Sequence, residues 1–333
     1  MSPPQLLVVL SSDPEGPVVR HRWEAYRAAL EAAGIVLEVV GWPKAKEARR
    51  HALHRVETAD GTVVSSRLLK VDDTRAVRRR TARLAFDLDD ALWYRDSARG
   101  ARSTWNRRRR FRALTRAADR VFAGNETLAD LVRRAGDEAA VFPTTVEVPP
   151  GDIPAEPLMP PPVLGWIGSH ATLPYLETEL LPLSAVVASG RPFRLRVVAD
   201  AAPSLPPGIA VEVVPWTLDG WLEALAGIHV GLAPLPDDPW TRGKCGLKVL
   251  QMMSVGRPVV ASAVGVQTEQ IEDGVTGFLA SNDEEFLDGM LTLIDDHERR
   301  AEMGHAAREA VRERWSVEVW TPRLVEAVEE WLR

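Results

Sequence analysis

Short apolar runs that alternate with helical segments are the feature of this sequence that most limits its fold. The first half holds such runs at residues 5–10 (QLLVVL), 35–42 (IVLEVVGW), 61–66, 84–88 and 118–124. Runs of this length are typical of strands buried in a parallel sheet. Helices are expected over residues 18–33, ending at Gly34, and after a capping Asn125, ending at Gly136. The alternation predicts a doubly wound, Rossmann-like α/β domain.

A proline-rich stretch at residues 148–162 (VPPGDIPAEPLMPPP) interrupts the alternation once. Proline resists both helix and ladder bonding, so a stiff connector is expected there. Strand-like runs then resume (VLGWIG, FRLRVVA, VEVVPW, IHVGLAP, RPVVAS, TGFLA). We therefore predict a first domain at 1–150, a linker at 151–162 and a second domain at 163–315. A closing helix at 316–333 is expected to pack back on the first domain. Two Rossmann-like domains facing a cleft would bind ligands at the carboxyl ends of their strands.

Composition excludes several classes of protein. The 333 residues are 45% hydrophobic and 26% charged, which is ordinary for a soluble globular protein. The sequence contains no run of 18 apolar residues, so a membrane span is not expected. The single cysteine and the scattered histidines argue against a Cys/His metal site. The single cysteine, together with an N-terminus that does not resemble a signal peptide, favours a cytoplasmic protein. Neither half carries a G-x-G-x-x-G or P-loop motif, which disfavours an ordinary dehydrogenase or NTPase.

Net charge is unevenly distributed, at +7 over residues 1–150 and −13 over the remainder. An anionic surface or substrate facing the first half and a genome-wide preference for arginine explain this equally well. The basic run at residues 99–112 (RGARSTWNRRRRFR) fits an anionic membrane surface, or simply a solvated face. Nucleic acid ranks last, because no nucleic-acid motif accompanies the run.

The stretch TRGKCGLKVLQMMSVGRPVVAS, residues 241–262, places lysines beside an expected helix start. Gly243 and Gly246 permit close backbone approach to a ligand, while Lys244 and Lys248 oppose the helix dipole unless an anion offsets them. The alternative is a solvent-facing lysine pair on an amphipathic helix, and spacing alone favours that alternative.

Acidic residues crowd the end of another expected strand, in FDLDDALW. Asp87, Asp89 and Asp90 would disfavour joint ionisation unless Arg20, Arg22 or Arg95 compensates them. They are interpreted either as groups that orient or deprotonate a hydroxyl of a ligand, or as the capped start of a helix.

Two further features lie near expected strand ends. The first strand-to-helix loop offers Gly16 and Arg20, and because Arg20 and Arg22 are two residues apart on a helix they cannot share one face. Trp216 follows the run VEVVP, where a ligand contact and a plain core tryptophan are nearly equally well supported.

The stretch GLKVLQMMSVGRPVVASAVGVQTEQIEDGVTGFLAS resembles the donor-binding signature of the retaining family-4 glycosyltransferases of the GT-B fold. Together with FAGNETLAD, GWIGSHATLPYLE and PLPDDPWTRGKCGLK, it resembles a bacterial branch with a GKCGxKxLQ form of the motif. The resemblance implies an α/β GT-B fold and a metal-independent enzyme that needs no cofactor beyond its nucleotide-sugar donor. It implies donor contacts from Gly168, Ser169, His170, Trp216, Gly246, Leu247, Gln251 and Glu269.

This sequence departs from the family pattern at two places. Gly243 and Gln251 stand where the family has two glutamates, and Ser169 and His170 stand where most members have an Arg/Lys pair for the diphosphate. The resemblance then leaves Lys244 and Lys248, with the helix amides, to carry the diphosphate charge.

The resulting prediction is a retaining hexosyltransferase with catalytic Lys244, Lys248 and Asp89. Gly16, Arg20, Asp87 and Asp90 are expected near the acceptor. The acceptor is expected to be a cell-surface glycan, a lipid-linked acceptor or a small molecule, with peripheral contact to the inner membrane face through residues 99–112. A catalytically degenerate binding or scaffold protein and a sugar-nucleotide epimerase on the same fold are the alternatives.

Overall fold

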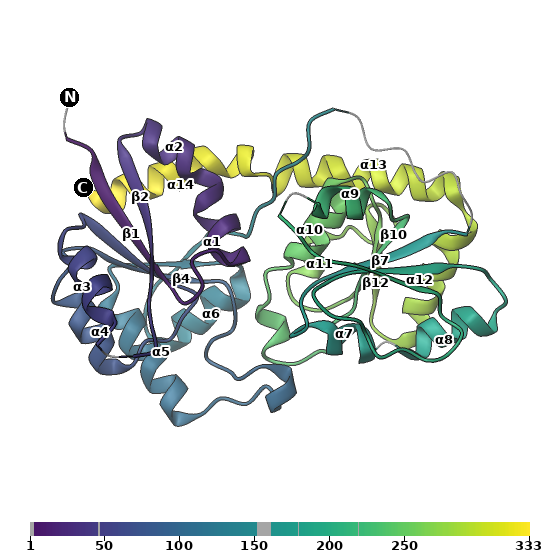
Figure 1. Ribbon diagram of the computed structural model, residues 1–333, viewed down its shortest axis with the longest axis horizontal. Coiled ribbons are helices and arrows are strands. Elements are labelled where there is room, and N and C mark those ends of the chain that lie inside the picture. The colour runs from purple at the N-terminus through teal and green to yellow at the C-terminus, as the bar shows by residue number, and fades with distance from the viewer. Residues whose placement is uncertain (1–2, 46, 152–160, 179, 219) are drawn as a thin grey trace. The chain divides into compact units, whose positions relative to one another are not determined.

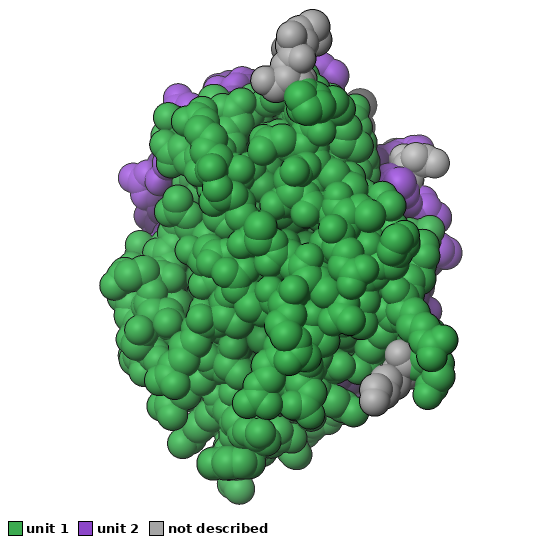
Figure 2. Space-filling view, turned by 90° about the vertical axis from the view of Figure 1, so that its left-hand side faces the viewer, with its two compact units in different colours: residues 1–145, 238–245, 317–333 green, residues 146–237, 246–316 purple. Residues whose placement is uncertain are grey.

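The computed structural model describes residues 3–45, 47–151, 161–178, 180–218 and 220–333. It divides into two compact units (Figure 2). Unit 1 comprises Met1–Thr145, Asp238–Cys245 and Val317–Arg333, and unit 2 comprises Val146–Asp237 and Gly246–Ser316. Most of the predicted proline-rich linker, residues 152–160, lies outside the described residues.

Unit 1 is built on a parallel six-stranded sheet with the strand order β2-β1-β3-β4-β5-β6. The strands are β1 (Gln5–Ser11), β2 (Ile35–Gly41), β3 (Gly61–Ser65), β4 (Leu84–Leu88), β5 (Arg120–Ala123) and β6 (Ala140–Val141). Side chains of β1 alternate between two cores, with Val8 and Leu10 in one and Leu7 and Val9 in the other. Both faces of the sheet are therefore covered, which explains why the strands read as unbroken apolar runs.

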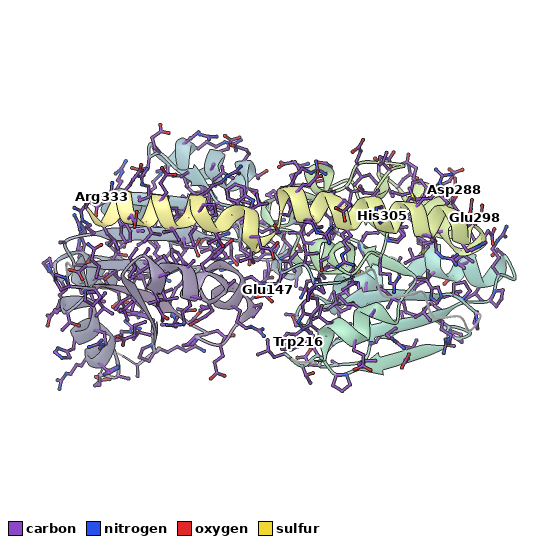
Figure 3. All side chains as sticks on the ribbon, turned by 90° about the horizontal axis from the view of Figure 1, so that it is seen from above. Glu147, Trp216, Asp288, Glu298, His305 and Arg333 are labelled. Atoms are coloured by element: carbon purple, nitrogen blue, oxygen red, sulfur yellow. The ribbon has the colours of Figure 1, made fainter. Side chains whose placement is uncertain are left out.

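Two sets of helices cover the sheet of unit 1 (Figure 1). One core takes side chains from α3 (Arg49–Glu57), α4 (Val71–Arg78), α5 (Trp105–Ala117) and α6 (Glu126–Ala135). After α1 (Pro17–Arg22), the other core joins Trp23, Tyr26 and α2 (Arg27–Ala32) to α14 (Val317–Leu332), the yellow helix that ends near Arg333 in Figure 3. Leu332 packs so tightly that a Cβ on Gly61 would come within 2.4 Å of it.

The helix predicted over residues 18–33 is broken in the structure. After α1, Trp23 adopts φ −133° and ψ −54°, a 3-10 turn follows at Glu24–Tyr26, and α2 then begins. Trp23 is 1% exposed and its indole donates a hydrogen bond to Asp87. A tertiary contact thus overrides a continuous helical pattern, while Gly34 (φ 81°) ends the segment as expected.

Unit 2 repeats the architecture with the parallel order β12-β11-β10-β7-β8-β9. Its strands are β7 (Val163–Ile167), β8 (Arg194–Val198), β9 (Val211–Val214), β10 (Val230–Ala233), β11 (Val259–Ser262) and β12 (Gly277–Ala280). The six correspond to the six apolar runs predicted after the linker.

Helices flank both faces of the second sheet as well (Figure 1). One core includes residues of α7 (Leu173–Thr178), α8 (Leu180–Ala188) and α12 (Asp283–Asp295), and the other includes residues of α9 (Trp221–Ala226) and α10 (Leu247–Ser254). The long α13 (His297–Arg314) contributes to both cores, and the short α11 (Gln267–Gln270) follows β11. None of the helices described is both long and apolar enough to span a membrane.

Residues 238–245 lie with unit 1, although the sequence placed them inside the second domain. The packing explains this difference. A Cβ at Gly243 would come within 2.6 Å of the Ala91 side chain and 3.0 Å of Leu128, so the backbone here lies directly against unit 1.

Candidate functional site

The buried Asp87 at the end of β4 is fully engaged by protein groups. Its Oδ1 accepts hydrogen bonds from Arg22 Nε (2.8 Å) and Nη2 (2.6 Å), and its Oδ2 accepts from Trp23 Nε1 (2.9 Å) and Ser65 Oγ (2.9 Å). Asp87 is 0% exposed and Arg22 is 6% exposed. Of the three arginines proposed to compensate the acidic run, Arg22 neutralises Asp87. This carboxylate therefore anchors α1 to the sheet.

Asp89 and Asp90 lie just beyond the strand in a different setting. Asp90 Oδ1 is 3.2 Å from Lys244 Nζ, which also lies 5.1 Å from the centre of the Trp240 ring. Asp89 Oδ1 is buried and has no hydrogen-bond partner among the described residues. Burial, followed by the neighbouring Asp90 and Asp87, raises the pKa of Asp89 well above its usual value, and Arg22 and Lys244 offset only part of this. The acidic run starts no helix, since turns follow β4, so the capped-helix interpretation is wrong.

Asn125 holds residues 243–245 against unit 1. Its Nδ2 donates to the carbonyl of Lys244 (3.0 Å) and lies 3.4 Å from that of Gly243, while its Oδ1 accepts from the backbone N–H of Leu128 and caps α6. The cap was predicted from the sequence. The clamp was not, because its partners are about 120 residues away in the chain.

Cys245 completes this contact. Its Sγ donates to the carbonyl of Asp89 (3.0 Å) and lies 3.7 Å from Asn125 Nδ2. A Cβ on Gly124 would come within 2.3 Å of the sulfur, so only glycine leaves the space it occupies. Burial raises the pKa of the Cys245 thiol to about 12, which makes it a packing group and not a nucleophile at neutral pH.

The loop after β1 contains the predicted Gly16 and Arg20. Gly16 precedes α1, and a Cβ there would come within 2.5 Å of Asp13 Oδ2. Arg20 is partly buried, and burial lowers its pKa while Asp13 opposes the shift. Since Arg22 points to Asp87, the two arginines lie on different faces of α1, as their spacing predicts.

In unit 2, the predicted Gly168, Ser169 and His170 follow β7. A Cβ on Gly168 would come within 2.2 Å of the Trp166 ring. Ser169 and His170 are exposed, and His170 contacts Asp200 through its backbone N–H (2.6 Å) and Nδ1 (2.7 Å). These hydrogen bonds lower the pKa of Asp200, a partner that the sequence analysis did not identify.

The start of α10 holds Lys248 over an aromatic ring. Gly246 caps the helix with φ 66°, and a Cβ there would meet the buried Gln270 amide. Lys248 Nζ lies 4.3 Å from the centre of the Trp166 ring, whose residue is 0% exposed. A cation at this distance is attracted by the ring, although the ring does not neutralise its charge. Lys248 is partly buried, so the alternative of a solvent-facing lysine pair on one helix does not describe the structure.

Four other predicted donor residues also fall in unit 2. Leu247 is partly buried at the first position of α10, and Gln251 is 5% exposed on its inner face. Glu269 is exposed on α11, and Trp216 is partly buried after β9, where it packs against one core of the unit (Figure 3).

The basic run forms most of α5 and presents two distinct faces. Trp105, 75% exposed, stacks with Arg109, whose guanidinium carbon lies 5.5 Å from the ring centre. Arg107 instead donates to the carbonyl of Leu92. Among the described residues, no group of three or more His, Cys, Asp or Glu side chains is arranged to hold a metal ion.

Residues 162–296 match the family model described as glycosyl transferases group 1. Over 72 residues, 22% of this chain, the sequence is 40% identical to the trehalose synthase of Pyrococcus horikoshii, and the match covers 17% of that protein's own length.

Solved structures resemble almost the whole chain. HepE of Anabaena in complex with UDP and glucose superposes with a TM-score of 0.73 at 18% identity, covering 98% of this chain and 100% of that one. Sucrose-phosphate synthase of Thermosynechococcus elongatus superposes with a TM-score of 0.74 at 15% identity, covering 98% of each chain. The two parallel six-stranded sheets with flanking helices therefore form a GT-B fold.

Proposed function

We propose that this chain is a metal-independent, retaining glycosyltransferase that moves a hexose from a nucleotide-diphosphate sugar to an acceptor hydroxyl. The observation that carries the proposal is the start of α10, where a left-handed Gly246 leads into a helix whose first turn holds Lys248 over Trp166. This element lies within the residues that match the group 1 glycosyltransferase model. Backbone amides and a cation at a helix start suit a diphosphate.

The donor is assigned to unit 2. Lys248 and the first amides of α10 stabilise the negative charge that grows on the diphosphate as its bond to the sugar breaks. Gly168, Ser169 and His170 after β7, with Leu247, Gln251, Glu269 and Trp216, form the remaining donor contacts. Lys244, held beside Asp90, is assigned to stabilise the same negative charge on the diphosphate. No cofactor beyond the donor is required in this scheme.

The acceptor is assigned to unit 1, near Asp89 and Asp90, with Gly16, Arg20 and the anchored Asp87 behind them. In the transfer step the acceptor oxygen bonds to the anomeric carbon on the face that the diphosphate leaves, which retains the configuration, and the diphosphate keeps the electron pair of the broken bond. Asp89 takes the acceptor proton. Its raised pKa supports this role, because a carboxylate with a higher proton affinity is a better general base.

A nucleotide-sugar panel tests the proposal. UDP-glucose is the first donor to try, since a similar structure contains UDP and glucose. We expect one donor to raise the melting temperature, and we expect sugar transfer to a glycan or lipid-linked acceptor with retained anomeric configuration, read by NMR. A panel without any shift would exclude the proposed activity.

The degenerate scaffold remains a second candidate because of Gly243. No side chain fits at that position without displacing Ala91, so this chain cannot place a carboxylate there as packed. The scaffold predicts no nucleotide binding at all. A sugar-nucleotide epimerase instead predicts that labelled donor is converted without any acceptor.

The outer face of α5 is proposed to contact an anionic membrane surface from the cytoplasmic side. The exposed Trp105 stacked with Arg109 supports this, because an amphipathic ring beside cations suits the lipid headgroup region. Sedimentation should show binding to phosphatidylglycerol vesicles but not to phosphatidylcholine vesicles, and Trp105→Ser should weaken it.

A further inference from the structure

Unit 1 contains a pocket of about 250 Å³ that the proposed transfer step does not use. Its polar lining consists of Ser12, Ser66, Arg67, Asn106, Arg107 and Arg110. Ser12 follows β1, Ser66 and Arg67 follow β3, and the other three residues come from α5. The pocket therefore lies at the carboxyl ends of β1 and β3, and β3 pairs with β4, whose end is followed by Asp89 and Asp90.

Two of the three arginines of the pocket donate hydrogen bonds to backbone carbonyls. Arg67 donates to the carbonyl of Trp42 (2.9 Å) and Arg107 to the carbonyl of Leu92 (3.0 Å). Within the described part of the chain, no carboxylate forms an ion pair with Arg67, Arg107 or Arg110. In contrast, the well-buried arginines of unit 1, Arg22 and Arg49, are each paired with an aspartate at 2.6 Å.

The arrangement leaves positive charge uncompensated in a partly buried place. Burial lowers the pKa of Arg67, and Arg49 adds to this while Asp73 opposes it. Burial also lowers the pKa of Arg107, with Arg95, Arg110 and Arg99 adding and Asp96 opposing. Each guanidinium carries five donors, of which Arg67 and Arg107 each use one on a carbonyl. An anion in the pocket would satisfy donors and charge together.

The wall of the pocket is also held in an unusual conformation. Ser66 has φ 48°, in the left-handed region that non-glycine residues rarely adopt, and its N–H donates to the carbonyl of Asp87 (2.8 Å). Backbone conformations that are unfavourable for a residue with a side chain are found most often at ligand-binding and active sites, where the surrounding structure enforces them. Here the enforcing contact is the same strand end that carries the acidic pair.

We propose that this pocket binds a phosphate group of the acceptor substrate, so that the acceptor is a phosphorylated molecule. The inference rests on the proposed transferase function, because it assigns the pocket to the acceptor. Three guanidinium groups exceed the single charge of a carboxylate and match a phosphate, whose oxygens also accept from the Ser12 and Ser66 hydroxyls and the Asn106 amide. A sugar phosphate and a lipid phosphate share this chemistry.

Calorimetry with three probes tests the pocket: glucose 1-phosphate, farnesyl phosphate and glucuronate, each with and without saturating UDP. We expect at least one phosphate probe to bind, and Arg110→Gln to raise its Kd about tenfold or more, as for loss of a charge-assisted contact. Arg116→Gln, an exposed arginine in the last turn of α5 and outside the proposed membrane face, is the matched control and should change the Kd less than about twofold. The probe that binds identifies a soluble or a lipid-linked source.

Asn106→Asp provides a second variant if Arg110→Gln fails to fold, and it should also weaken phosphate binding by placing a negative charge in the pocket. The proposal is overturned if neither phosphate binds, if Arg110→Gln binds it as well as wild type, or if glucuronate binds equally tightly. Failure of the transferase proposal shows separately, as a lack of UDP binding, and leaves the phosphate titrations readable.

Discussion

Asp87 and Asp89 stand two residues apart at one strand end, yet their surroundings are opposite. Asp87 accepts four hydrogen bonds from Arg22, Trp23 and Ser65, whereas Asp89 keeps one buried oxygen without a partner and has a raised pKa. The first is a completed structural ion pair, and the second is a desolvated carboxyl group that we propose as the base of the transfer step. Position in the sequence therefore does not distinguish Asp87 from Asp89 as the candidate base, whereas their contacts do.

The largest effect is expected for Asp87→Asn. The change leaves the buried Arg22 guanidinium without its counter-charge, and breaking such a pair costs about 3–5 kcal/mol of unfolding free energy. Denaturant titration measures this. Asp130→Asn is the matched control, because its pair with Arg133 is 54% exposed on the aspartate side and should matter by less than about 1 kcal/mol. If both variants lost the same unfolding free energy, the buried pair of Asp87 would contribute no more to stability than the exposed pair of Asp130, which would contradict this account.

Asp89→Asn should have the reverse profile. Turnover is expected to fall about a hundredfold or more, as for loss of a general base. The unfolding free energy should stay constant or rise, because a desolvated carboxyl group is replaced by a neutral amide of the same size. Steady-state kinetics and denaturant titration on one preparation separate the two effects. A variant that loses stability but keeps turnover would show that Asp89 has a structural role and is not the general base.

His21, one residue before Arg22, makes the fold around Asp87 sensitive to acid. Burial, with Arg20 adding to it, lowers the pKa of His21 to about 4 from its ordinary 6.5. Between these values the unfolded chain binds a proton that the folded chain does not, so unfolding free energy falls as pH falls. The loss is at most about 3 kcal/mol. His21→Gln should flatten stability between pH 6.5 and 4, and an unchanged slope would assign the acid sensitivity elsewhere.

Asn125→Ala is expected to have the smallest effect, about 1–2 kcal/mol for the lost helix cap and clamp. Its diagnostic result is chemical. Without the clamp, residues 243–245 should open more often, so Cys245 should react faster with a thiol reagent. Asn282→Ala in unit 2 removes only the cap of α12 and should leave that rate unchanged. Equal rates in both variants would mean that Asn125 does not hold the segment.

The fold was largely predictable because the inner strands β3, β4, β7, β10 and β11 are buried along their whole length and so read as apolar runs. The helix break at Trp23 was not predictable, and Arg22 was only one of three arginines that the sequence offered as a partner for the acidic run, since both features depend on a contact about 65 residues away. The contact of Gly243 with Ala91 depends on close packing, and the only sign of that packing in the sequence is the glycine itself. Local spacing identified the acidic run, but only three-dimensional contacts divide it into an anchor and a candidate base.

Titration of UDP by calorimetry tests the central claim most directly. The account predicts binding to the wild-type protein that Lys248→Gln weakens about tenfold, as expected for loss of a cation from a phosphate contact. His305→Gln, on α13 of the same unit, should leave the affinity unchanged (Figure 3). A wild-type protein that releases no heat with UDP or GDP, or a Lys248→Gln variant that binds as tightly as wild type, would contradict the assignment of the donor diphosphate to the start of α10.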